Sequence, residues 1–172
     1  MNFGRAFHEM ATVSLRSIDE TNWLVAVELS VNDEQDGFVW SNGNSLAQAR
    51  YESWWIPLGI YIGDEMVGFV MHGRWPYQPV NAAHSLPTPG NDHIARVMID
   101  KDHQGKGYGR AALVALIELI NAQGNCRAIE VCFNPDNVVA EKLYASLGFV
   151  RTGRIIDGEV EMRLDSSNRY FT

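Results

Sequence analysis

A glycine-rich segment at residues 104–109, with the sequence QGKGYG, is the part of the chain best suited to bind an anion. Glycine allows positive φ, so backbone amides can approach a ligand closely. An apolar, β-branched stretch at residues 94–99 precedes the segment and is typical of a strand. Apolar residues at 113–120 then recur at the spacing of a largely buried helix. A strand, a glycine turn and a helix N-terminus in this order predict a backbone cradle for a pyrophosphate.

The glycine pattern alone leaves a second interpretation open, because glycines between a strand and a helix often serve only the turn. The segment is not a Walker loop, which needs G-x-x-x-x-G-K-[ST]. It also departs from the dinucleotide fingerprint G-x-G-x-x-G, since Ala112 stands where the last glycine belongs. Another kind of phosphate-binding family must therefore account for the pattern if an anion binds here.

A second informative segment, NVVAEKLYASLGF, lies downstream at residues 137–149. Its apolar residues recur at helical spacing, with Pro135 suited to a first turn and Gly148 to the helix end. The pattern Gln104-x-x-Gly107-x-Gly109 after a strand resembles the acetyl-coenzyme A motif of the GNAT superfamily of N-acetyltransferases. The downstream segment resembles that family's N-x-x-A-x-x-L-Y-x-x-x-G-F motif, and the two occur in the family's order.

The resemblance implies the GNAT fold, of the α/β (α+β) class, over one domain of residues 1–172 with a core at about 12–164. That fold has a mixed, mostly antiparallel, twisted sheet of about six or seven strands flanked by about four helices. Hydrophobic periodicity and turn residues give the same order of elements. The expected strands are 12–16, 58–62, 66–71, 94–99, 128–133, 149–156 and 159–164, and the expected early helices are 19–29 and 45–54. A proline-rich loop is expected from Arg74 to Asp92.

The resemblance also assigns residues to acetyl-CoA, which it implies as the acetyl donor. Strand backbone would hold the pantetheine arm and polarise the thioester carbonyl, and the glycine turn would hold the pyrophosphate. These residues are Val97, Met98, Ile99, Gln104, Gly105, Lys106, Gly107, Tyr108, Gly109, Arg110 and Asn137. Asn137 also has the place of a helix cap, and both roles are compatible.

Catalysis of amide formation needs a proton for the leaving thiolate and a base for the amine. The resemblance gives the first task to Tyr144, whereas periodicity alone favours Tyr144 as a core aromatic residue. The base is His93, at the beginning of the predicted fourth strand, or ordered water. His93 and Ala95 depart from the more polar or acidic pair of polyamine-type relatives, so both the base and the amine class stay open.

The N-terminal half resembles bacterial spermine/spermidine N-acetyltransferases, in the runs 31–39 and 45–49. Carboxylates there can pair with ammonium groups, and indole rings can add cation–π contacts. The candidate substrate residues are Glu28, Glu34, Asp36 and Trp75. The expected reaction is direct attack of a primary amine, most simply spermidine or spermine, on the thioester. Two alternatives remain: another amine such as an amino acid, antibiotic or protein N-terminus, and a non-catalytic acyl-CoA sensor.

Composition limits the other function classes. The chain has 172 residues, 46% apolar residues and a formal charge of −7, as expected for one acidic globular domain. Acidic charge argues against nucleic acid, and no apolar run suits a membrane span or a signal peptide. We expect a cytoplasmic protein with reduced Cys126 and Cys132 and no metal site. Members of the superfamily are often homodimers, but no interface can be assigned from this sequence.

Overall fold

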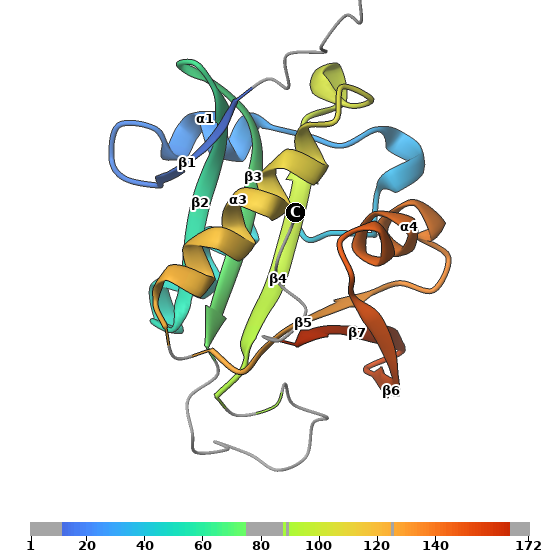
Figure 1. Ribbon diagram of the computed structural model, residues 1–172. Helices are drawn as coiled ribbons and strands as arrows, with labels where there is room; N and C mark the ends of the chain where they lie inside the picture. The colour runs from blue at the N-terminus through green and yellow to red at the C-terminus, as the bar shows by residue number, and fades with distance from the viewer. Residues whose placement is uncertain (1–11, 75–87, 89, 125, 166–172) are drawn as a thin grey trace, which may run out of the picture.

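The computed structural model describes residues 12–74, 88, 90–124 and 126–165, which form seven strands and four α-helices (Figure 1). The strands are β1 (Val13–Ser17), β2 (Trp55–Ile62), β3 (Glu65–Arg74), β4 (Asp92–Ile99), β5 (Ala128–Phe133), β6 (Val150–Ile156) and β7 (Glu159–Asp165). The helices are α1 (Trp23–Glu28), α2 (Asn42–Tyr51), α3 (Tyr108–Ala122) and α4 (Val138–Ser146), with 3₁₀ turns η1 (Asp33–Gln35) and η2 (Lys101–His103). This order confirms the fold class expected from the sequence.

One seven-stranded sheet runs through the molecule in the order β1-β2-β3-β4-β5-β7-β6. Neighbouring strands are antiparallel except β4 and β5, which are parallel. The β4–β5 connection therefore has to cross over, and it does so through α3, as parallel strands require. The predicted mostly antiparallel mixed sheet is confirmed.

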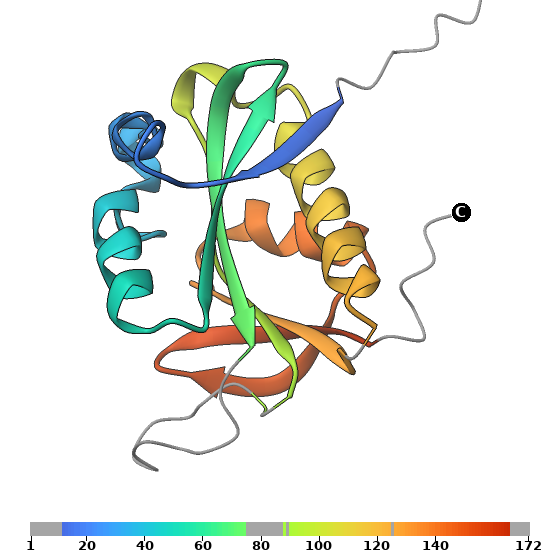
Figure 2. The ribbon, with the colours of Figure 1, turned by 90° about the vertical axis from the view of Figure 1, so that its left-hand side faces the viewer.

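The helices cover both faces of the sheet (Figure 2). Helices α3 and α4 bury the larger apolar core, which contains Leu113, Leu116 and Ile117 of α3 and the side chain of Tyr144 of α4. Helices α1 and α2 cover the opposite face, where Phe69 of β3 is fully buried. The two cores hold β4 between them, so its backbone is fixed from both sides.

Helix α1 begins later than the sequence predicts, at Trp23 instead of near Asp19. The Asp19 carboxylate accepts hydrogen bonds from the backbone N–H of Thr21, at 2.8 Å, and from its hydroxyl, at 2.6 Å. Asp19 therefore closes a local turn before the helix instead of capping its first turn. These bonds hold its pKa below its usual value, and burial opposes them only weakly.

Helix α2 begins earlier than predicted, at Asn42 instead of Ser45. The hydroxyl of Ser41 accepts a hydrogen bond from the backbone N–H of Asn44, at 3.2 Å, which is a standard helix N-cap. The segment 41–44, expected to be a turn, is thus the cap and first turn of the helix. The helix ends at Tyr51, before the predicted end at Trp54.

The predicted hairpins are confirmed. Strands β2 and β3 turn at residues 63–64, where Gly63 has a φ of 58°. Strands β6 and β7 turn at Asp157 and Gly158, whose φ angles of 50° and 86° are those that two-residue hairpin turns favour. Most of the expected loop between Arg74 and Asp92, including Trp75, lies outside the described residues.

Candidate active site

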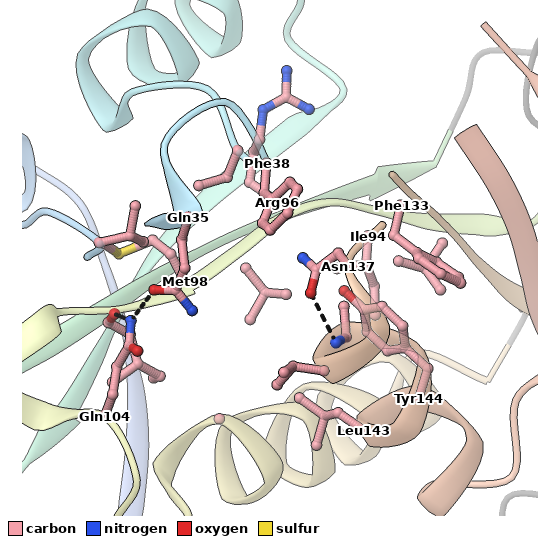
Figure 3. Close-up of a pocket in the computed structure, with 18 of the residues that line it drawn as sticks. Gln35, Phe38, Ile94, Arg96, Met98, Gln104, Phe133, Asn137, Leu143 and Tyr144 are labelled. Carbon is pink, nitrogen blue, oxygen red and sulfur yellow. Dashed lines mark hydrogen bonds between the residues drawn. The ribbon is translucent and has the colours of Figure 1, made fainter. Parts of the chain in front are cut away.

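A cavity of about 460 Å³ opens where β4 and β5 diverge (Figure 3). The two strands pair only over Asp92–Ile94 and Ile129–Val131. Beyond this point residues 95–99 of β4 line the cavity, while their other edge continues to pair with β3. Backbone N–H and C=O groups on the open edge of β4 therefore have no partner strand and can bind a ligand.

The glycine-rich loop closes one end of the cavity. Gly105 and Gly107 have φ angles of 74° and 81°, and a methyl group added to either would meet nothing within 4 Å. Gly107 is the N-cap of α3, which has no side-chain cap and no acidic residue in its first turn. The first amide groups of this helix are therefore available to an anion, and the helix dipole adds to the attraction. The residues present fit a diphosphate.

The third glycine of the loop, Gly109, lies where α3 meets β4 and α4. A methyl group added there would lie 3.6 Å from Cγ1 of Ile99 and 3.8 Å from Cδ2 of Leu143, which are ordinary van der Waals distances. The packing of α3 therefore does not require glycine at this position. Tyr108 and Arg110, on either side of it, also line the cavity.

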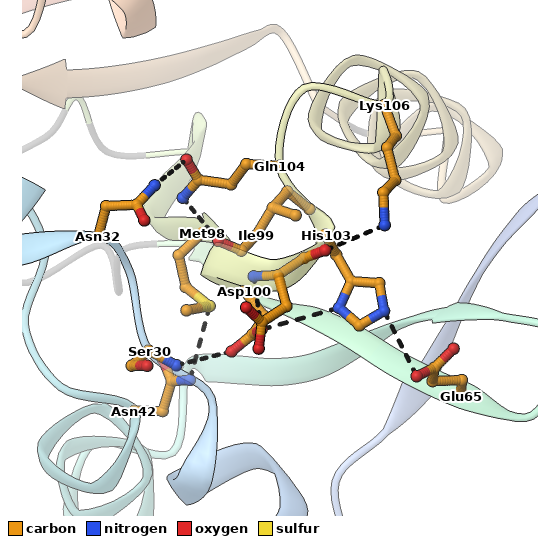
Figure 4. Close-up of polar contacts among 11 residues, drawn as sticks. Ser30, Asn32, Asn42, Glu65, Met98, Ile99, Asp100, His103, Gln104 and Lys106 are labelled. Carbon is orange, nitrogen blue, oxygen red and sulfur yellow. Dashed lines mark hydrogen bonds and ion pairs between the residues drawn. The ribbon is translucent and has the colours of Figure 1, made fainter.

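The side chains of Gln104 and Lys106 form hydrogen bonds with other parts of the protein (Figure 4). The side-chain amide of Gln104 donates hydrogen bonds to the carbonyl oxygen of Ile99, at 3.0 Å, and to Oε1 of Gln35, at 2.7 Å. Gln104 thus fixes the loop to β4 and to η1. The Nζ of Lys106 donates to the carbonyl oxygen of Asp102, at 3.0 Å, and Lys106 does not line the cavity. Arg110 is the predicted cation that does.

Asp100, which follows β4, joins the N-terminal segment to the glycine loop (Figure 4). Its carboxylate accepts hydrogen bonds from the backbone N–H of Ser30, at 3.0 Å, and of Asp102, at 3.1 Å. Burial would raise the pKa of Asp100, but these bonds outweigh it and lower the pKa below its usual value. Sequence reasoning gave Asp100 no structural role, because its partner Ser30 is distant in the chain.

Tyr144 lies in the cavity wall, close to Phe133 (Figure 3). Its ring centroid is 5.9 Å from that of Phe133 and 5.8 Å from that of Phe149. The side chain is 4% exposed, and its hydroxyl has no hydrogen-bond partner among the described residues. Burial, with the nearby charge of Glu159, raises the pKa of Tyr144 well above its usual value. The phenol is therefore protonated at neutral pH and can act only as a proton donor.

Asn137 has the capping role expected from the sequence. Its Oδ1 accepts a hydrogen bond from the backbone N–H of Ala140, at 3.0 Å, and this bond begins α4. Asn137 also lines the cavity, so its amide group stays near any ligand there (Figure 3). Helix α4 ends at Ser146, and Gly148, whose φ is 86°, then reverses the chain toward β6.

Two charged residues from different strands, Arg96 and Glu159, line the cavity. Arg96 of β4 lies over the ring of Trp40, with its guanidinium carbon 4.8 Å from the ring centroid, and its Nη2 donates to Gln48 at 3.3 Å. Glu159 is the first residue of β7 and is half-buried. Burial raises the pKa of Glu159, although Arg96 partly opposes this shift. Neither charge was placed in the site by sequence reasoning.

Cys132 also lines the cavity, on β5. Burial, together with the carboxylates Glu161, Glu159 and Glu130, raises the pKa of Cys132 to about 12. The thiolate, which is the nucleophilic form of cysteine, is therefore scarcely populated at neutral pH. Cys132 is thus a poor nucleophile in this cavity.

His93 lies near the cavity but does not line it. Its ring centroid is 6.1 Å from that of Trp55, and its Nδ1 is buried without a hydrogen-bond partner among the described residues. Burial lowers the pKa of His93 to about 4, and nearby carboxylates counteract this only in part. The side chain is thus neutral but weakly basic, and it has no direct path to a ligand in the cavity.

The predicted substrate residues do not gather at one place. Glu28 and Glu34 are exposed and line neither cavity. Asp36, together with its neighbour Asp33, lines a second cavity of about 370 Å³. This second cavity shares Trp40 and Met98 with the first, so the two adjoin. Trp75 lies outside the described residues.

Two negative findings concern the described ranges alone. Within them no three or more histidine, cysteine, aspartate or glutamate side chains are grouped so that they could hold a metal ion. None of the helices in the same ranges has the length and apolar character needed to cross a membrane.

Comparison with known proteins identifies the family. A model of the acetyltransferase (GNAT) family matches residues 13–149, which is most of the chain, so the protein belongs to this family. A spermine/spermidine N(1)-acetyltransferase of Bacillus subtilis is 27% identical over 152 residues, covering 88% of this chain and 97% of its own length. The resemblance noted in the sequence and the assignment to acetyltransferases are confirmed.

Solved structures of low sequence identity have the same fold. An aminoglycoside acetyltransferase in complex with coenzyme A aligns with a TM-score of 0.75 at 19% identity, over 91% of this chain and 96% of its own. A spermidine N-acetyltransferase of Vibrio cholerae, in complex with coenzyme A and spermine, aligns with a TM-score of 0.68 at 17% identity, over 92% and 98%. At these identities the likeness establishes the fold.

Proposed function

We propose that this acetyltransferase uses acetyl-CoA to acetylate a primary amine, and that the amine is a polyamine such as spermidine or spermine. The observation that carries the proposal is the cavity between the diverging β4 and β5. It has an anion cradle at Gly105 and Gly107 and a protonated phenol at Tyr144. A diphosphate ligand with a reactive arm matches this combination.

Several chain segments would hold the coenzyme. The amide groups of residues 105–110 would bind the diphosphate, and Arg110 would pair with its oxygens. The open backbone edge of residues 95–99, near the side chain of Asn137, would hold the pantetheine arm. When bound, acetyl-CoA supplies an acyl group activated as a thioester. The backbone amides of β4 would polarise its carbonyl, and Tyr144 would protonate the departing sulfur.

Two observations support a polyamine as the acceptor. The Bacillus relative named for spermine and spermidine is aligned over nearly its whole length. The second cavity, lined by Asp33 and Asp36, adjoins the first. Carboxylates placed there could pair with a distal ammonium group while the reacting amine occupies the first cavity. A carboxylate that holds the distal group leaves the reacting nitrogen free to lose its proton.

An amine panel tests this proposal. Thiol release from acetyl-CoA is measured with spermidine, spermine, amino acids, an aminoglycoside and a peptide with a free N-terminus. We expect kcat/KM for the polyamines to exceed that for amino acids by about 100-fold. An amine without a distal ammonium group cannot pair with the carboxylates of the second cavity and leaves them without a partner. Faster release with another class would reassign the substrate. Coenzyme binding by calorimetry without any turnover would favour the acyl-CoA sensor.

Substitution of the cavity thiol tests direct transfer. Cys132→Ser is expected to keep kcat within about threefold of the wild type, since a thiol whose pKa is near 12 contributes almost no thiolate. Turnover is followed by thiol release, and intact mass spectrometry after mixing with acetyl-CoA alone checks for an acetylated enzyme. Loss of activity in the variant, together with a mass increase of the wild type, would contradict direct attack.

The compartment is also part of the proposal. We infer that the protein acts in the cytoplasm, because its acetyl donor, acetyl-CoA, is an intracellular metabolite. Fractionation of cells, followed by assay of the polyamine-dependent activity, tests this. We add the proposal of a homodimer from the resemblance alone, which light scattering of the purified chain would check.

A further inference from the structure

Glu159 occupies an unusual position in the cavity. It is the first residue of β7 and follows the hairpin turn at Asp157 and Gly158. Its neighbour Val160 pairs with Phe133, whose ring contacts that of Tyr144. The Glu159 side chain lines the cavity, and no hydrogen bond or ion pair of its carboxylate lies within the part of the chain that the structure describes.

The charged and titratable groups around Glu159 belong to four different parts of the chain. Arg96 of β4 attracts the carboxylate, and Asp157 in the turn repels it. The phenol of Tyr144 on α4 and the thiol of Cys132 on β5 both respond to its charge, which contributes to their raised pKa values after burial. Glu159 is thus within electrostatic reach of the groups that surround the reaction site. A half-buried carboxylate without a hydrogen-bond partner costs free energy, and a bound cation would offset that cost.

We propose that Glu159 binds the ammonium group of the acceptor in the β4–β5 cavity and takes the proton that must leave before attack. This inference rests on the function proposed above and assigns a base that the sequence did not reveal. His93 was the candidate base on the chain, but it lies outside the cavity lining.

Glu159 and Tyr144 together can accept and donate every proton that the reaction moves. Glu159 takes one proton from the ammonium, and the freed lone pair forms the new C–N bond as the C–S bond breaks. Tyr144 gives a proton to the sulfur and recovers one from the nitrogen as the amide forms. Glu159 then releases its proton to water. The products are the N-acetylated amine, the free thiol and one proton.

Burial and Arg96 shift the pKa of Glu159 in opposite directions, and both shifts suit a general base. Burial raises the pKa of Glu159, which makes it a stronger base than an exposed carboxylate. Arg96 opposes this rise and so favours the ionised form of the carboxylate. The contact with Trp40 and the hydrogen bond to Gln48 fix the position of the Arg96 side chain.

Glu159→Gln tests the proposal, with Glu118→Gln as the matched control because Glu118 is exposed on α3 and outside both cavities. We expect Glu159→Gln to lower kcat/KM for spermidine about 100-fold near pH 7, while coenzyme A binding by calorimetry stays unchanged. The deficit should shrink as the pH rises toward about 10, because the amine then loses its proton in solution. Glu159→Asp, which keeps the carboxylate, should retain the acid limb of the wild-type pH profile.

Three outcomes would overturn this inference. Wild-type rates in Glu159→Gln would show that the carboxylate takes no part. A deficit that is constant with pH, or is accompanied by weaker coenzyme binding, would mark Glu159 as merely structural. If the wild type itself releases no thiol with any amine, the proposed function fails and this inference fails with it; the first two outcomes leave the function intact.

Discussion

Tyr144→Phe is expected to lower kcat by about 100-fold or more while leaving the affinity for coenzyme A unchanged. The substitution removes only the hydroxyl, which is the proton donor proposed for the leaving thiolate. The ring that packs between Phe133 and Phe149 is retained, so the fold should persist. Thiol release with spermidine measures kcat, and calorimetry with coenzyme A measures binding.

The control for this variant is Tyr51→Phe, because Tyr51 is 89% exposed at the end of α2 and does not line the cavity. The ratio of wild-type to variant rates should be the same from about pH 6 to about pH 9, since burial keeps the Tyr144 phenol protonated throughout this range. A kcat equal to that of the wild type would leave Tyr144 as a core aromatic residue. This flat ratio also distinguishes Tyr144 from Glu159, whose deficit should vary with pH.

The parts of the site that the sequence predicted are those with local determinants. Positive φ at Gly105 and Gly107 follows from glycine between a strand and a helix. The inward position of Tyr144 follows from helical spacing, and Asn137 caps α4 because a side-chain oxygen at that position can accept the third amide of the helix. Each of these features depends on neighbours within a few residues in the chain.

The parts that sequence reasoning missed depend on pairing between distant strands. Glu159 enters the cavity because β7 pairs antiparallel with β5, and Arg96 meets Trp40 because β4 approaches the segment after η1. His93 looked suitable as a base by its distance along the chain from Gln104. Its ring instead packs toward Trp55, outside the cavity lining, because His93 lies where β4 still pairs with β5, before the two strands diverge.

The exact ends of the helices were also not predictable from the sequence alone. Both Asp19 and Ser41 are residues that favour caps, and composition alone does not say which of them caps a helix. In the structure Ser41 caps α2, whereas Asp19 closes a turn with Thr21 before α1 begins. A tertiary contact accompanies the early start of α2. The Nδ2 of Asn42, its first residue, donates a hydrogen bond to the carbonyl oxygen of Ala26 in α1, at 2.8 Å.

The second large effect is expected at the anion cradle, where Gly107→Ala should raise the KM for acetyl-CoA about 100-fold. Gly107 has a φ of 81° and begins α3. A side chain there strains the backbone and projects into the open space where the diphosphate would lie. Loss of two charge-assisted hydrogen bonds from backbone amides would account for about 3 kcal/mol, which is about 100-fold in affinity. Initial rates at varied acetyl-CoA and calorimetry with coenzyme A measure the change.

Gly63→Ala separates the loss of binding from backbone strain. Gly63 also has a positive φ, 58°, and a methyl group there would likewise meet nothing within 4 Å, but it lies in the β2–β3 turn, outside the cavity lining. Both variants should lose a similar stability, about 1 kcal/mol, measured as a lower Tm. Only Gly107→Ala should lose affinity for the coenzyme. An unchanged KM in that variant would mean that the glycine serves the turn and that the diphosphate binds elsewhere.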